Sequence, residues 1–202
     1  MPDSVVDQCT LPLVAVNNEY CATTDKPLGK QPVMLLYQDP AGTPPDLITV
    51  GTPDTRLAKL QAALALPDGD ANKLYVIKNL AGGTVPAPTD TTLSGNDVPY
   101  GGTRITDRSR SLTARIDFLT PSNNTALNQL TARQKPVRTW EVDEEGLVFG
   151  PYENSTIVVG GIIKAGIGGA PTHRPITVTT RGIDEAPFAA APLVGIQGIK
   201  NA

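Results

Sequence analysis

The sequence predicts a mainly β domain with two short helices. Short runs in which apolar and polar residues alternate recur along the chain, as expected of strands with one buried face. Glycine and proline number 19 each, which suits many turns between short strands. Only residues 52–66 and 121–135 carry apolar residues at helical spacing.

The length suits one large domain or two small ones, and we predict a single soluble domain over residues 1–202. Of the 202 residues, 40% are apolar and 18% charged, and only 4% are aromatic. The core must therefore consist mainly of Val, Ile, Leu and Ala. No apolar run approaches the roughly 18 residues that a membrane span requires, and the N-terminus lacks a signal-peptide pattern. We expect synthesis in a cytoplasm and no membrane partner.

The central third of the chain predicts a strand, a helix and a hairpin. Residues 111–118 alternate strictly, and Thr120 followed by Pro121 is a helix-start signal. Two apolar runs flank the turn DEEG, whose Gly146 can adopt positive φ. We expect Arg133 and Lys135 in the last turn of the helix, where positive charge is favourable. The predicted core of this unit comprises Leu112, Ile116, Phe118, Leu127, Leu130, Trp140, Val142 and Val148.

The remaining elements follow from the same patterns. A helix with Thr52 or Asp54 as N-cap and Pro53 in its first turn is predicted over 52–66. Residues 1–31 are predicted to be an N-terminal arm, and residues 81–102 a loop of about 20 residues, a length at which loops usually have a function or order on a partner. Strands are expected at 32–38, 47–50, 73–80, 155–163 and 174–183, with a bulge or a close backbone approach at Gly160 and Gly161.

No constellation of an enzyme is present in the sequence. His173 is the single histidine, so multi-histidine metal sites are excluded, and no P-loop lysine or GxSxG sequence occurs. Asp68 and Asp70 lack the spaced ligands of an EF-hand loop. Cys9 and Cys21 could form a disulfide or remain free thiols. We predict that the protein is not an enzyme and has no catalytic residue, cofactor or metal.

The charge distribution argues against specific nucleic-acid binding. The net charge is −3, with about −5 on residues 1–100 and about +2 on residues 101–202. No basic run with interleaved aromatic residues occurs. The arginines at 104, 108, 110 and 115 are expected to lie on a solvated strand face or to form salt bridges between subunits.

The strand SLTARIDFL, the helix PSNNTALNQLTAR and the hairpin VRTWEVDEEGLVFG followed by STIVVGGII resemble the tail tube proteins of tailed bacteriophages. The resemblance covers about 90 residues and is one of pattern, without a diagnostic motif. It implies a small β-sandwich or partly open β-barrel with a flanking helix, a long loop and an N-terminal arm. Such subunits stack as hexameric rings in the virion tail. The helix at 53–66 departs from the family pattern.

The resemblance implies a structural virion protein whose partners are further copies of itself and other tail or head proteins. DNA would pass through the lumen without specific binding. Alternatives are a capsid decoration or head–tail completion protein, or a monomeric carbohydrate-binding or adhesion module, for which exposed aromatic residues are scarce. We predict that the subunit interface contains apolar residues of the 81–102 loop and the neighbouring arginines: Val85, Leu93, Val98, Tyr100, Arg104, Arg108 and Arg110.

Overall fold

The computed structural model describes residues 31–48, 52–95, 102–117, 119–133, 135–164, 172–182, 192–193 and 195–199. In these ranges the chain forms one antiparallel sheet of eight strands. The elements are β1 (Pro32–Gln38), α1 (Pro53–Leu64), β2 (Leu74–Ile77), β3 (Leu80–Thr84), β4 (Thr89–Ser94), β5 (Thr103–Ile116), α2 (Pro121–Ala132), β6 (Val137–Asp143), β7 (Val148–Val159), β8 (Arg174–Arg181) and the 3₁₀ turn η4 (Ile196–Gly198). The predicted β-rich class with two helices is confirmed.

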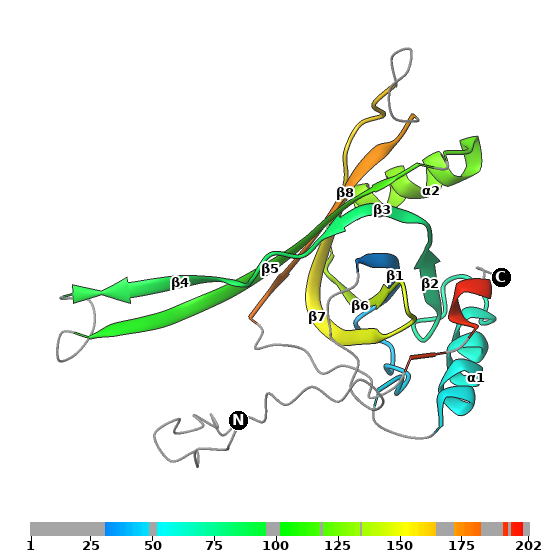
Figure 1. Ribbon diagram of the computed structural model, residues 1–202, viewed down its shortest axis with the longest axis horizontal. Coiled ribbons are helices and arrows are strands. Elements are labelled where there is room, and N and C mark those ends of the chain that lie inside the picture. Colours follow the sequence, from blue (N-terminus) through cyan, green and yellow to red (C-terminus); the bar gives the residue numbers. More distant parts are fainter. Residues whose placement is uncertain are drawn as a thin grey trace.

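The sheet curls on itself without closing. Its strand order is β2-β1-β6-β7-β8-β5-β3, and β4 pairs with β5 alone. β2 and β3 lie at opposite ends of this order, yet only Lys78 and Asn79 separate them in sequence. The two ends of the sheet must therefore approach each other, and Figure 1 shows the resulting ring-like cross-section. The expected sandwich of two sheets is wrong, and the single curled sheet is closer to the expected open barrel.

Both helices begin where the sequence predicts. The Thr52 hydroxyl accepts a hydrogen bond from the backbone N–H of Thr55, and the Thr120 hydroxyl accepts one from that of Asn123. These bonds satisfy N–H groups that the first turn of a helix leaves unpaired. The C-terminal expectation is wrong: α2 ends at Ala132, so its last turn contains no basic residue.

Two hydrophobic cores lie on opposite faces of the sheet. The inner core fills the curl beneath α2 and contains Leu35, Leu80, Leu112, Ala114, Ile116, Leu127, Val137, Ile157, Val159, Ile176 and Val178, with Leu130 and Val85 packed against it. The outer core lies between β1, β2, β6 and α1 and contains Met34, Leu36, Leu47, Leu60, Ala63, Leu64, Leu74, Val76, Trp140, Val142, Val148, Leu193, Ile196 and Ile199. The predicted single core is therefore wrong, because successive residues of a strand point to opposite faces. Phe118 lies outside the described residues.

Two expectations about the backbone are corrected. Part of the predicted 81–102 loop is paired strand, since β3 and β4 both pair with β5. Leu47 and Ile48 belong to no strand, while residues 49–50 lie outside the described part of the chain. Residues 1–30 of the predicted N-terminal arm also lie outside the described part of the chain.

Two strand expectations are corrected in their bounds: residues 73–80 divide between β2 and β3, and the expected 155–163 strand is the end of β7, which stops at Val159. The 143–148 hairpin turns through Gly146 at φ +86°. A Cβ on Gly160 would lie 2.6 Å from Pro175 Cγ, so the predicted close approach at this glycine is confirmed. Nothing lies within 4 Å of a Cβ built on Gly161, so the close approach concerns Gly160 alone.

Candidate assembly surface

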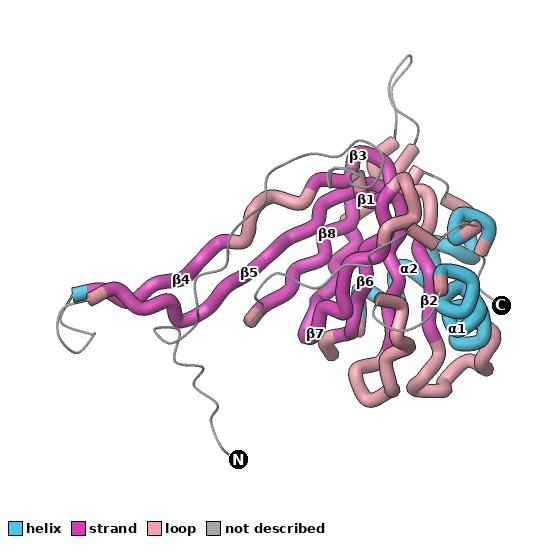
Figure 2. Tube along the Cα trace, turned by 60° about the horizontal axis from the view of Figure 1, so that its bottom comes forward, coloured by secondary structure: helices cyan, strands magenta, loops and turns pink. Residues whose placement is uncertain are grey.

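The most distinctive feature of the molecule is a two-stranded arm that extends away from the curled sheet (Figures 1 and 2). It consists of β4 and the outer half of β5, residues 103–108. All six residues of β4 are exposed. β8 pairs with β5 only from Ser109 to Ile116, and Gly182 donates to the Arg108 carbonyl just beyond. Residues 103–107 pair with β4 on one side, and no described strand pairs with their other edge. A two-stranded ribbon of this kind is marginally stable alone.

The arm is shaped by an irregular register and an ion pair. The register shifts between Thr91 and Thr92, which pair with Asp107 and Ile105. The Thr106 hydroxyl donates to the Thr91 carbonyl at 3.0 Å beside this bulge. Nearer the sheet, the Arg108 guanidinium donates twice to Asp90, with Nη2 3.1 Å from Oδ2. These hydrogen bonds hold the pKa of Asp90 below its usual range.

Each face of the arm presents a large apolar side chain to solvent. Leu93 is 44% exposed and pairs with Arg104, while Ile105 is 51% exposed and pairs with Thr92. Directly paired residues share a face, and neighbouring residues alternate, so Leu93 and Ile105 lie on opposite faces. An exposed strand edge with apolar side chains is a template for pairing with another chain.

A partly buried ion pair fixes the root of the arm. Arg110 Nη2 lies 2.7 Å from Glu141 Oε2 on β6, and the guanidinium lies 4.5 Å from the ring centre of Tyr152 on β7. Glu141 is only 6% exposed. Burial raises the pKa of Glu141, and the Arg110 guanidinium opposes this shift. Removing Arg110 would leave the buried Glu141 carboxyl without its partner, so the pair ties β5 to β6 where β8 ends.

The predicted interface residues have different environments. Val85 packs against the inner core, and Arg108 and Arg110 form ion pairs within the subunit. Leu93 and Arg104 are exposed side by side on the arm. Val98 and Tyr100 lie outside the described residues.

Sequence reasoning missed Ile105 as an interface candidate. It stands alone among polar neighbours in TRITDR, and this isolation was the available signal.

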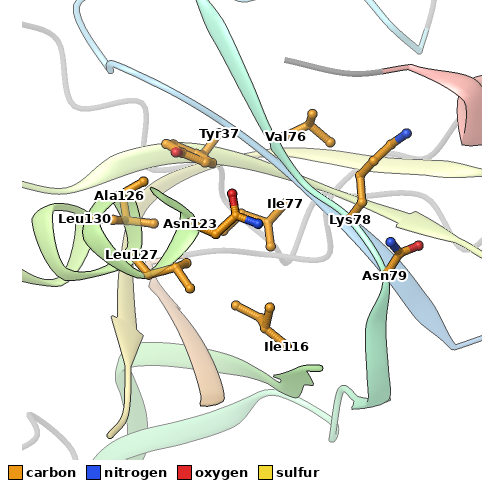
Figure 3. A pocket seen from close by; sticks show the side chains of 10 residues that line it. All are labelled: Tyr37, Val76, Ile77, Lys78, Asn79, Ile116, Asn123, Ala126, Leu127 and Leu130. Atoms are coloured by element: carbon orange, nitrogen blue, oxygen red, sulfur yellow. The ribbon is translucent and has the colours of Figure 1, made fainter. Parts of the chain in front are cut away.

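The structure also contains a cavity of about 310 Å³ between α2 and the two ends of the sheet (Figure 3). Its lining consists of Tyr37, Val76, Ile77, Lys78, Asn79, Ile116, Asn123, Ala126, Leu127 and Leu130. This described lining holds no Ser, Cys, His, Asp or Glu, and burial raises the pKa of Tyr37 to about 12. Tyr37 therefore stays protonated near neutral pH and cannot serve as a base. Lys78 is the one charged residue of this described lining, and the cavity brings no second acid or base beside it.

The described residues contain no group of three or more His, Cys, Asp or Glu side chains placed to hold a metal ion. No helix among them has the length and apolar character needed to cross a membrane.

No protein-family model matches the sequence, and no curated protein is similar to it in sequence. Among solved structures, the chain is similar to one chain of a "Virion of native gene transfer agent (GTA) particle". The TM-score is 0.33 and the identity 10%, over 57% of this chain and 88% of the other. A likeness at this level is too low to assign a shared fold or function.

Proposed function

We propose that this protein is a structural virion component that self-assembles into stacked rings, most specifically the tail tube of a tailed bacteriophage. The observation that carries the proposal is the projecting β4–β5 arm. Its residues contribute to neither core, no other described strand pairs with its outer edges, and it exposes Leu93 and Ile105. The resemblance of the central strand, helix and hairpin to tail tube proteins supports the same assignment.

The arm would gain stability on assembly. A two-stranded ribbon without a packed face is marginal in a monomer, whereas pairing and burial against a neighbour would stabilise it. One copy would donate its arm and receive another, which is a heterologous contact. Such contacts close into rings when the rotation between copies is an integral fraction of a turn. We propose hexameric rings, with the arm reaching the adjacent subunit or the next ring.

The proposal assigns the protein no catalytic role. Its partners are further copies of the chain and other tail or head proteins, and DNA passes through the lumen without specific binding. Every cationic contact along such a path would add salt-dependent affinity for phosphate, so a conduit requires few of them.

An armless variant tests the proposal. Thr89 pairs directly with Ser109, so residues 90–108 can be replaced by Asn-Gly, which forms a tight hairpin turn between paired strands. The remaining chain keeps both hydrophobic cores and the pairing of β5 with β8. We expect a folded monomer with unchanged cooperativity of unfolding that forms no rings or tubes. Normal tubes from a folded armless variant would refute the role of the arm.

A further inference from the structure

One outward face of the sheet is almost entirely hydroxyl-bearing. On β5, β8 and β7, the inward side chains belong to the inner core, so their neighbours in sequence point outward. The outward side chains in the middle of these strands are Ser111, Thr113, Thr156, Val158, Thr177 and Thr179. We call this set, together with Thr84 of β3, the hydroxyl face.

Strand register arranges the hydroxyl face in two rows across the sheet. In the first row, Thr179 pairs with Ser111 on one side and Thr156 on the other. In the second row, Thr177 pairs with Thr113 and Val158. The Thr84 hydroxyl extends this second row, because it lies 2.8 Å from that of Thr113.

No charged side chain interrupts these rows. The nearest cations on the same face are Arg115, which is ion-paired with Asp117 at 3.0 Å, and Arg181, which pairs with Ser109 where β8 ends. The surface of a soluble domain is usually about 25–35% Lys, Arg, Glu and Asp, with both signs mixed. A neutral hydroxyl surface across several strands departs from that composition. The face also lacks the aromatic residues that typify a protein–protein interface.

We propose that the hydroxyl face lines the channel of the assembled tube and is the wall past which double-stranded DNA moves. This inference rests on the proposed function and specifies which surface does that work. Each lysine or arginine on the wall would bind a DNA phosphate and release its counterion. Each such contact steepens the fall of log K with log salt by about 0.9. Hydroxyl groups donate and accept hydrogen bonds without net charge. They therefore keep the wall hydrated and add no charge attraction to the DNA phosphates.

The position of the arm agrees with this orientation. β5 continues from the hydroxyl face directly into the arm, so a neighbour that engages the arm lies beside the same surface (Figure 2). α1 covers the opposite side of the curled sheet, over β1, β2 and β6. In this orientation, α1 lies on the outside of the tube.

Thiol accessibility tests the inference. Thr177→Cys and Thr113→Cys report on the hydroxyl face, and Gln61→Cys on exposed α1 is the matched control, each in a chain with Cys9→Ser and Cys21→Ser. N-ethylmaleimide is small enough to enter a channel, whereas a maleimide carrying a long polyethylene glycol chain is not. In assembled tubes, we expect the Thr177→Cys and Thr113→Cys thiols to react with the small reagent and lose reaction with the large one. Gln61→Cys should react with both, and unassembled subunits should react with both at every position.

Each other outcome contradicts the inference in a distinct way. Tubes whose Thr177→Cys and Thr113→Cys thiols still react with the large reagent overturn it and leave the proposed function standing. Protection from both reagents means that a second copy covers this face, which also overturns it. If the parent chain forms no rings or tubes, the proposed function fails and this inference fails with it. If either Thr177→Cys or Thr113→Cys does not fold, the other variant reports on the hydroxyl face.

Discussion

Replacing the two exposed apolar side chains of the arm should weaken assembly without weakening the fold. Leu93 is 44% exposed and Ile105 51% exposed, so about half of each side chain remains to be buried by a partner. Full burial of a Leu or Ile side chain contributes about 1.5–3 kcal/mol, so half of it corresponds to about 1 kcal/mol each. Leu93→Ser with Ile105→Ser should therefore cost about 2 kcal/mol per subunit at the contact.

The expected effect is an increase in the critical concentration for assembly. At 1.4 kcal/mol per tenfold, about 2 kcal/mol corresponds to roughly a 30-fold increase. Sedimentation of polymer from a dilution series measures this concentration, and thermal unfolding of the unassembled subunit monitors the fold. Surface substitutions away from structural features usually change stability by less than about 0.5 kcal/mol, so the unfolding curve should not move.

Ile162→Ser is the matched control, because Ile162 is 50% exposed and lies off the arm. We expect it to leave the critical concentration unchanged. An equal increase for Ile162→Ser and for the arm variant would show that general loss of surface hydrophobicity is responsible. An unchanged critical concentration in the arm variant would refute the reasoning.

Three further predictions concern the subunit. Trp140 is fully buried in the outer core, so Trp140→Ala should lower the free energy of unfolding by about 3–5 kcal/mol in urea titrations; an unchanged midpoint would mean that the core is misassigned. Burial raises the pKa of Glu141 above 4.5, so the folded state holds this proton at a pH where the unfolded state has lost it. The parent should therefore lose stability relative to Glu141→Gln as pH rises above 4.5. A stability difference between the two proteins that does not change with pH contradicts this. Hydrogen bonds from the Ala41 backbone and from Arg133 hold the pKa of Asp39 below 3.8, so the parent should lose stability relative to Asp39→Asn as pH falls below 3.8; a loss at higher pH would contradict the assignment.

The sequence predicts elements well where the cause is local. Thr52 with Pro53, and Thr120 with Pro121, fix helix starts through hydrogen bonds within one turn. Gly146 fixes a hairpin because few other residues tolerate its positive φ. In these cases the determining atoms lie within a few residues of each other in the chain.

The arm and the two cores could not be predicted, because their causes are not local. β4 has no buried face, so its TDTTLS sequence shows no alternation of apolar and polar residues; backbone pairing with β5 makes it a strand. Trp140 and Val137 lie three residues apart on β6, so alternation alone puts them on opposite faces. That both faces are buried depends on the curl of the sheet and on α1, which the local sequence does not show. The ion-pair partner of Arg110 is Glu141, 31 residues away in the chain. From the sequence alone, Arg110 is therefore expected either on a solvated face or in a salt bridge to a neighbouring subunit.

Negative-stain electron microscopy of the purified parent chain tests self-assembly most directly. Samples are imaged over a range of protein concentrations and salt, beside the armless variant, in which Asn-Gly replaces residues 90–108. We predict rings or tubes of uniform diameter from the parent chain, and dispersed monomers from the armless variant. A parent chain that remains monomeric at every concentration and salt would contradict the proposed assembly.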